Sequence, residues 1–162
     1  MSNKNISGTV KLIVSIGICL SAGFLGSFFT TPAIPVWYAG IIKPSFAPPN
    51  WVFFPIWTVL FVMMGISLYL VWQKDAGEQK VKKAIFIFCI QLILNVLWSA
   101  AFFGWRSPFA GFMVILILWI SIALTVISFM KISKTAGVLL IPYIAWVTFA
   151  AVLNFLIWRL NN

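Results

Sequence analysis

The chain has 162 residues, of which 63% are hydrophobic and only 8% are charged. A soluble domain is roughly 45–50% apolar and about 25% charged, and a compact domain of this length cannot hide so large an excess of apolar surface from water. The net charge of +9 comes from 11 Lys and Arg residues against 2 acids. The basic residues lie singly or in small groups between long apolar runs, which is typical of membrane topology signals and argues against a nucleic-acid interface.

Five apolar stretches reach the roughly 20 residues that a helix needs to cross the bilayer core. Proline-containing breaks at residues 30–32, 48–50 and 107–108 delimit them. Pro55 falls near the first turn of the second span, whereas Pro142 lies deeper in the fifth and is expected to bend it. We predict an all-α membrane protein, one domain over residues 1–162, built as a bundle of five transmembrane helices with a long structured loop between the first two. The predicted spans are residues 10–29, 51–72, 84–103, 109–130 and 136–158.

The distribution of Lys and Arg predicts the orientation of the spans, because the side richer in these residues faces the cytoplasm. We expect a multi-pass protein of the cell membrane with a cytoplasmic N-terminus and an exterior C-terminus. The first span lacks a small-x-small cleavage site, so we expect it to be retained rather than removed as a signal peptide. The N-terminal side carries Lys4, Lys11, Lys74, Lys80, Lys82, Lys83, Lys131 and Lys134, and the other side carries Lys43, Arg106 and Arg159.

Residues 30–50 form the one long connection between spans, and they contain several prolines together with Trp37, Tyr38 and Phe46. Long loops inside compact domains tend to be functional, and we interpret this one as a lid over the exterior mouth of the bundle. The alternative is an aromatic belt at the level of the lipid headgroups, which also suits Trp37 and Tyr38. The chain shows no internal repeat, so an inverted-repeat transporter is not indicated.

The inventory of reactive side chains excludes several kinds of chemistry. The sequence has no histidine, and Cys19 and Cys89 fall inside apolar runs, so we expect neither a metal site nor a structural disulfide. Asp75 and Glu78 lie in the second loop, and no ionisable residue lies near the middle of a span. An ion-coupled pump, a paired-carboxylate hydrolase, a metalloenzyme and a Ser/His/Asp enzyme are therefore not expected.

Three spans each carry a face on which aromatic rings alternate with neutral polar side chains at helical spacing. A buried amide in lipid needs a hydrogen-bond partner, so we predict that these faces point inward. The alternative for Gln91, Asn95 and Asn154 is that they only join neighbouring helices. Trp98 and Trp146 lie too deep in their spans to act as interfacial anchors. The faces are Gln91, Asn95, Trp98 and Phe102 in the third span, Trp146, Ala150, Leu153 and Asn154 in the fifth, and Trp51, Phe54 and Thr58 in the second.

The order and spacing of many residues from Trp37 to the C-terminus resemble the translocator protein family, also called tryptophan-rich sensory proteins or peripheral benzodiazepine receptors. The chain is similar to a bacterial member of that family. The resemblance is carried by Trp37-Tyr38, Lys43-Pro44, Pro48-Pro49, Trp51-Val52-Phe53, Pro55-Ile56-Trp57-Thr58, Met64-Gly65, Gln91-Leu92, Leu94-Asn95, Trp98, Phe102-Phe103-Gly104, Pro142-Tyr143, Ala145-Trp146, Phe149-Ala150, Leu153-Asn154 and Trp158-Arg159.

The resemblance implies a pocket under the first loop that binds porphyrins, such as protoporphyrin IX, and isoquinoline-type ligands. It also implies a homodimer. The small residues Gly17, Ser21, Ala22 and Gly26 of the first span would permit close helix approach, although such spacing more often serves packing within one chain than a dimer interface. The proposed cholesterol motif of animal members needs a tyrosine where this chain has Phe155, so cholesterol recognition is not carried over. The implied pocket residues are Trp51, Asn95, Trp98, Trp146, Ala150 and Leu153, to which the inward faces add Phe54.

A porphyrin is a flat apolar disc with two propionates, and we expect it as a ligand, with no cofactor required. Lys43 is a candidate partner for a propionate, although snorkelling to lipid phosphate is an equal alternative. The absence of histidine predicts a preference for metal-free protoporphyrin over haem. Three functions stay open: a tetrapyrrole sensor or scavenger, light- and oxygen-dependent porphyrin breakdown with Trp51 and Trp146 as catalytic residues, and a passive carrier of an apolar ligand.

Overall fold

The computed structural model describes residues 7–162, and the regular secondary structure in that range is helical. Five helical spans are long and apolar enough to cross a membrane. The predicted bundle is confirmed, and the chain is a multi-pass membrane protein. Lys4, counted above on the N-terminal side, lies outside the described residues. The helices are α1 (Gly8–Ala33), α2 (Asn50–Trp72), α3 (Glu78–Ser99), α4 (Pro108–Met130), α5 (Lys134–Leu139) and α6 (Ile141–Leu160).

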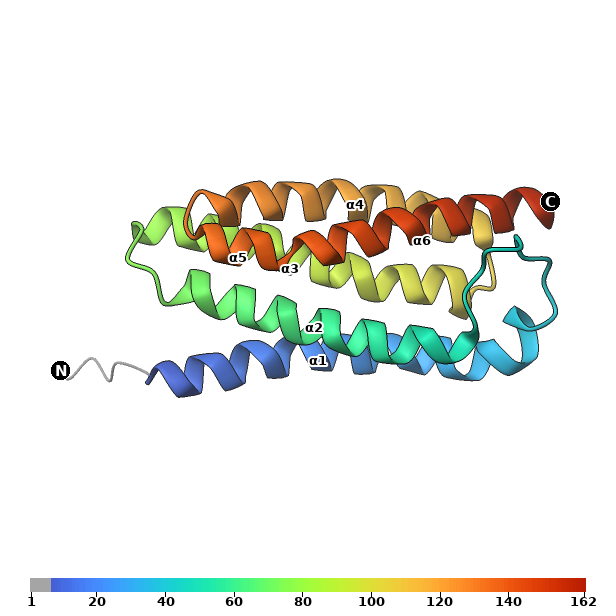
Figure 1. Cartoon of the computed structure of the whole chain (residues 1–162), viewed down its shortest axis with the longest axis horizontal. Coiled ribbons are helices and arrows are strands. Elements are labelled where there is room, and N and C mark those ends of the chain that lie inside the picture. The colour runs from blue at the N-terminus through green and yellow to red at the C-terminus, as the bar shows by residue number, and fades with distance from the viewer. Residues whose placement is uncertain (1–6) are drawn as a thin grey trace.

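The helices run side by side along one axis, and the two ends of the bundle carry different segments (Figure 1). The loop of residues 39–49, the connection between α3 and α4 and the C-terminus gather at one end, called here the loop end. The start of α1 and the other two connections lie at the opposite, N-terminal end. Both acids, Asp75 and Glu78, are in the connection and first turn that link α2 to α3. The loop end thus holds basic residues and no acidic ones.

The first helix is longer than the sequence predicted, and the expected end at Pro32 is wrong. α1 passes through Pro32 and continues as a π-helical segment as far as Tyr38, so the loop proper is residues 39–49. Proline removes one backbone donor, but a local π-helical adjustment can re-satisfy freed carbonyls inside a membrane. Here the backbone N–H of Ala39 donates to the carbonyl of Ile34 at 3.0 Å. This bond closes the π-helical segment and keeps the backbone of the last turn hydrogen-bonded.

The third and fifth spans also extend beyond the prediction. α3 begins at Glu78 rather than at residue 84, and it continues as a π-helical segment over Ala100–Gly104. The fifth span is interrupted at Leu140, where α5 gives way to α6, with Pro142 in the first turn of α6. The disturbance expected from this proline is therefore confirmed, and it takes the form of a break between two helices.

The helices pack in a closed arrangement in which α1 contacts α2 and α3, α4 contacts α3 and α6, and α5 contacts α2 and α4. α1 and α2 approach so closely that a Cβ atom on Gly65 would lie 2.5 Å from the Cα of Ile16. Only glycine fits there. α2 and α6, by contrast, meet mainly through aromatic side chains near the loop end, such as Phe53 and Trp146.

Candidate functional site

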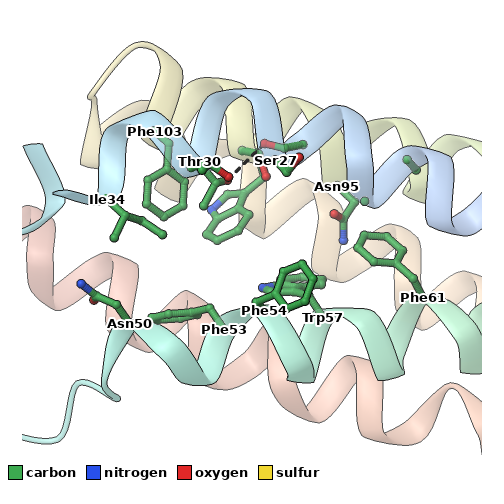
Figure 2. Close-up of a pocket in the computed structure, with 16 residues that line it drawn as sticks. Ser27, Thr30, Ile34, Asn50, Phe53, Phe54, Trp57, Phe61, Asn95 and Phe103 are labelled. Carbon is green, nitrogen blue, oxygen red and sulfur yellow. Dashed lines mark hydrogen bonds between the residues drawn. The ribbon is translucent and has the colours of Figure 1, made fainter. Parts of the chain in front are cut away.

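A cavity of about 140 Å³ lies between α1, α2 and α3 in the half of the bundle toward the loop end. In Figure 2 the rings of α2 face the hydroxyl-bearing side chains of α1 across it, with Asn95 of α3 to one side. None of the lining residues in the described chain carries a charge. The lining consists of Ala22, Gly23, Gly26, Ser27, Thr30, Thr31, Ile34, Asn50, Phe53, Phe54, Trp57, Phe61, Asn95, Trp98, Ser99 and Phe103.

Aromatic rings form a continuous series along the α2 and α3 walls of the cavity. The ring of Trp57 lies 5.7 Å from that of Phe61 at 30° and 6.1 Å from that of Trp98 at 34°. Trp98 in turn stacks on Phe102 at 5.8 Å and 24°. Flat apolar surfaces of this kind favour flat apolar ligands, because ring faces stack in offset geometry.

The polar atoms around the cavity are neutral, and two hydroxyls of its α1 wall are already engaged. The hydroxyl of Ser27 donates to the carbonyl of Phe24 at 2.6 Å, and that of Thr30 donates to the carbonyl of Gly26 at 3.1 Å. These bonds satisfy the donors while leaving an oxygen lone pair free to accept from a ligand. The α1 wall is thus weakly polar rather than apolar.

Asn95 connects the cavity to a buried hydrogen-bond network. Its side-chain amide donates to the hydroxyl of Tyr143 at 2.9 Å, and that hydroxyl donates to Oε1 of Gln91 at 2.8 Å. Gln91 and Tyr143 are fully buried. Asn95 therefore serves both as a wall of the cavity and as a tie between α3 and α6.

Asn154 holds Trp98 in place. The indole N–H of Trp98 donates to Oδ1 of Asn154 at 3.1 Å, and the amide of Asn154 donates to the carbonyl of Pro108 at 2.7 Å. The interpretation that Gln91 and Asn154 join neighbouring helices is confirmed by these bonds. Asn154 also fixes the plane of Trp98, so it acts on the cavity from outside it.

The predicted site residues fall into three groups. Phe54, Asn95 and Trp98 line the cavity. Trp51 is 74% exposed on the outer face of α2, so the structure does not bring it into this cavity. The residues predicted on α6 lie behind the cavity wall, where Trp146 is half-buried and Ala150 and Leu153 are buried.

Phe53 lies between the cavity and Trp146. Its ring lines the cavity and lies 6.2 Å from the rings of both Tyr38 and Trp146. The hydroxyl of Tyr38 and the indole N–H of Trp146 are buried without a hydrogen-bond partner in residues 7–162. A buried polar group left unpaired costs about 1–3 kcal/mol. Tyr38 and Trp146 thus each hold a buried donor without a partner, and both rings lie beside Phe53.

Lys43 is held by its own loop. Its ammonium donates to the carbonyls of Tyr38 and Ile41 at 2.6 and 3.0 Å, and it lies 4.8 Å from the centre of the Tyr38 ring. The group therefore caps the end of the first helical span. It does not line the cavity.

The loop folds back onto the end of the bundle. Asn161 at the end of α6 accepts a hydrogen bond from the backbone N–H of Ile42 at 2.9 Å and donates to its carbonyl at 2.8 Å. Trp37 packs against Phe102 at 5.4 Å, and Tyr38 is only 2% exposed. Tyr38 is thus not a belt residue. The loop contacts the end of α6, but none of residues 39–49 lines the cavity, so its role as a lid stays a prediction.

Sequence reasoning missed Phe53, Phe61 and Phe103 and did not place Trp57 in the site. Phe53, Trp57 and Phe61 recur at intervals of four residues, so they share one face of α2. This spacing favours the face of α2 next to the one that carries the predicted residues Trp51 and Phe54. Phe103 lies in the π-helical segment, whose wider turn changes the residue spacing and carries no clear signal.

Comparison with known proteins gives one consistent result. The family model described as TspO/MBR family matches residues 15–159. The tryptophan-rich protein TspO of Chlorobaculum tepidum is 46% identical over 159 residues, covering 98% of this chain and 99% of the relative. The human translocator protein is 37% identical over 140 residues, covering 86% and 83% of the two chains. Protein CrtK of Rhodobacter capsulatus is 35% identical over 143 residues, with 88% of each covered.

Proposed function

Because the chain belongs to the TspO/MBR family, we propose that it binds a flat tetrapyrrole, protoporphyrin IX in its metal-free form, within the membrane. The observation that carries this proposal is the uncharged cavity lined by the rings of Trp57 and Trp98, with Phe102, outside the lining, stacked on Trp98. A porphyrin disc stacks on ring faces, and isoquinoline-type ligands are flat and apolar in the same way. The protein would act as a tetrapyrrole sensor or scavenger.

The cavity must enlarge to take such a ligand. Its volume of about 140 Å³ is below the roughly 300–1,000 Å³ of typical small-molecule pockets. Rotation of Phe53 would join the cavity to the region beside Trp146, where the unpaired donors of Tyr38 and Trp146 lie. The ligand would then also reach Ala150 and Leu153. This proposal accounts for the separation between the cavity and the predicted residues of α6.

Lys43 keeps its proposed role as a propionate partner only when the loop opens. In the present arrangement its ammonium is bound to two carbonyls of the loop, and both bonds must break before it can pair with a carboxylate. Replacing Lys43 with Ala should then weaken protoporphyrin binding and reduce its dependence on salt. If protoporphyrin affinity and its salt dependence are unchanged, Lys43 only caps the end of the first helical span.

A protoporphyrin titration of the purified protein in the dark tests the proposed function. Ser27 lines the cavity from α1, and the larger side chain of Ser27→Phe would fill the cavity. We therefore expect the protoporphyrin affinity of this variant to fall by about tenfold or more. Leu20→Phe is the control, because Leu20 is exposed on the same helix and lines neither this cavity nor the groove between α1 and α3. If both variants bind like the original protein, the ligand lies elsewhere. A parallel titration with haem should show weaker binding, since the chain has no histidine to ligate iron.

Light-dependent porphyrin breakdown is the second candidate, favoured by Trp146 with its unpaired indole beside Phe53. An excited porphyrin would exchange an electron with this tryptophan and then react with oxygen. Under illumination the complex should lose porphyrin absorbance faster than free porphyrin in the same detergent, and Trp146→Phe should remove the difference. Trp105→Phe, at a residue 73% exposed in the connection to α4, is the control. If all samples bleach equally fast, the protein binds porphyrin without promoting its breakdown.

We further propose a cytoplasmic N-terminus and a homodimer. The distribution of basic residues supports the orientation, and labelling of a cysteine introduced at Asn162 by an impermeant reagent in intact cells would test it. A groove lined by Gly17, Ser21 and Ala22 of α1 with Leu92 and Val96 of α3 supports self-association through this lipid-facing surface. Cross-linking through a cysteine at Gly17 in membranes should give a dimer, and its absence would argue against this interface.

A further inference from the structure

A second cavity, of about 430 Å³, lies at the loop end of the bundle, outside the site described above. It is bordered by Trp37 and Ile41 next to the lid, by Arg106 and Phe109 at the start of α4, and by Trp158 and Asn161 at the end of α6. Unlike the first cavity it includes a cationic side chain. It lies where the helices end, which is the level of the lipid headgroups for a bundle that spans a membrane.

Arg106 carries the one charged side chain that lines this cavity in the described chain. Asn162, the last residue of the sequence, also lines it, and its carboxylate forms no ion pair with Arg106. The exposed Arg106 side chain takes part in no ion pair or hydrogen bond within residues 7–162. The two acids of the sequence, Asp75 and Glu78, lie at the opposite end of the bundle. Lys43 is already bound to loop carbonyls. Arg106 is therefore the free cation at the cavity, and an anion is the missing partner.

The aromatic residues beside the cavity continue it into the membrane. Trp158 packs against Phe109 at 5.1 Å and against Phe112 at 5.9 Å. Phe155 extends the series, 5.2 Å from Phe112. These rings lie along α4 and α6, where Phe109 and Phe155 are exposed to lipid. A ligand with a charged head and an apolar tail could contact both Arg106 and this aromatic surface.

We propose that the second cavity binds an anionic glycerophospholipid. Its phosphate pairs with the Arg106 guanidinium, which offers several N–H donors in a planar fork, and its acyl chains lie on Phe109, Phe112 and Phe155. An arginine that merely snorkels to the nearest headgroup would accept a zwitterionic lipid equally well. The cavity predicts a preference, because the lipid enters a formed site whose one charged side chain is positive and unpaired. This site goes beyond the proposed porphyrin site and shares none of its lining residues.

Native mass spectrometry of the purified protein in a nonionic detergent tests the site, with dioleoyl-phosphatidylglycerol and dioleoyl-phosphatidylcholine as probes. We expect the anionic lipid to bind about fivefold tighter, since one basic residue near an anionic surface contributes ~1 kcal/mol. Arg106→Asn should abolish this preference. Asparagine is chosen because Arg106 has a φ of +53°, a left-handed conformation that asparagine tolerates. Arg106→Lys should retain most of the preference and shows that loss is not a folding defect.

Arg159→Gln is the matched control, because Arg159 lies at the same end of the bundle in the last turn of α6 but does not line the cavity. It should keep the preference for the anionic lipid. Equal loss in Arg106→Asn and Arg159→Gln, or equal binding of the two lipids by the original protein, would overturn the proposal. Displacement of the bound lipid by millimolar inorganic phosphate would also overturn it, since the site would then bind a free anion rather than a lipid.

Discussion

The half of the bundle toward the N-terminal end is packed differently from the half that holds the cavity. In the first, the rings of Phe88 and Phe129 stack at 5.5 Å and 10°, and the hydroxyl of Ser67 donates to the carbonyl of Ala136 at 2.7 Å. A Cβ atom on Gly137 would overlap Cγ of Met130. This half has little room for movement, so it is expected to carry most of the stability of the fold.

The half toward the loop end keeps its room and its unpaired polar groups. It contains the cavity between α1, α2 and α3, and it borders the buried donors of Tyr38 and Trp146. Ser15 is the one buried, unpaired hydroxyl of the other half within the described chain. Rigid packing and adaptable packing thus occupy different halves of the bundle along the membrane normal. A ligand site can stay loosely packed because the opposite half holds the helices in register.

Gly65 offers the strongest test of the packed half. Gly65→Ala places a methyl group 2.5 Å from the Cα of Ile16, so we expect a loss of about 1–3 kcal/mol in the free energy of unfolding. Gly17→Ala is the control, because a Cβ atom there meets nothing within 4 Å, and alanine favours helix by up to about 1 kcal/mol. Thermal unfolding in detergent measures both. Similar midpoints for the two variants would show that the close approach of α1 and α2 is not needed.

Tyr143 tests the boundary between the halves. Tyr143→Phe removes the hydroxyl that joins Asn95 to Gln91, and the two amides then lose their shared partner. We expect a loss of about 1 kcal/mol in stability together with weaker protoporphyrin binding, because Asn95 is no longer held at the cavity wall. Tyr69→Phe serves as the control, since Tyr69 makes no side-chain hydrogen bond within residues 7–162. An unchanged protoporphyrin affinity of Tyr143→Phe would show that the hydrogen-bond network is not needed for binding.

The interaction of Asn161 with the loop tests the predicted lid, and its loss has the smallest expected effect of the three. Asn161→Ala removes both side-chain hydrogen bonds to Ile42, so the loop should open more often. Because an exposed hydrogen bond is worth about 0.5–1 kcal/mol, we expect protoporphyrin dissociation to accelerate roughly two- to fivefold with little change in stability. Stopped-flow displacement measures the rate. Asn162→Ala, at a residue with no such bond to the loop, should leave it unchanged, and equal rates in all three proteins would contradict the lid.

The span number could be predicted because apolar length is a property of the sequence alone. The ends could not, since the expected stop at Pro32 rests on rules for helices in water, whereas lipid favours continued backbone bonding through a π-helical turn. Which face of each helix points inward was also poorly determined by the sequence. Trp51 and Phe54 were assigned to the site, but both are more than 70% exposed and only Phe54 reaches the cavity. In a membrane helix the outward face is as apolar as the inward one, so periodicity loses its contrast.

The sequence by itself determined that the chain lies in a membrane, how many times it crosses, and its family. Composition, the length of apolar runs and the spacing of motifs do not depend on tertiary contacts. The sequence also placed Asn95 and Trp98 on an inward face, since a polar side chain in lipid must find a partner. Only the tertiary structure decided which rings meet across helices. Phe53 and Trp57 became walls of the cavity, Trp146 was left behind Phe53, and Lys43 was bound by its own loop. These outcomes depend on packing between segments distant in the chain.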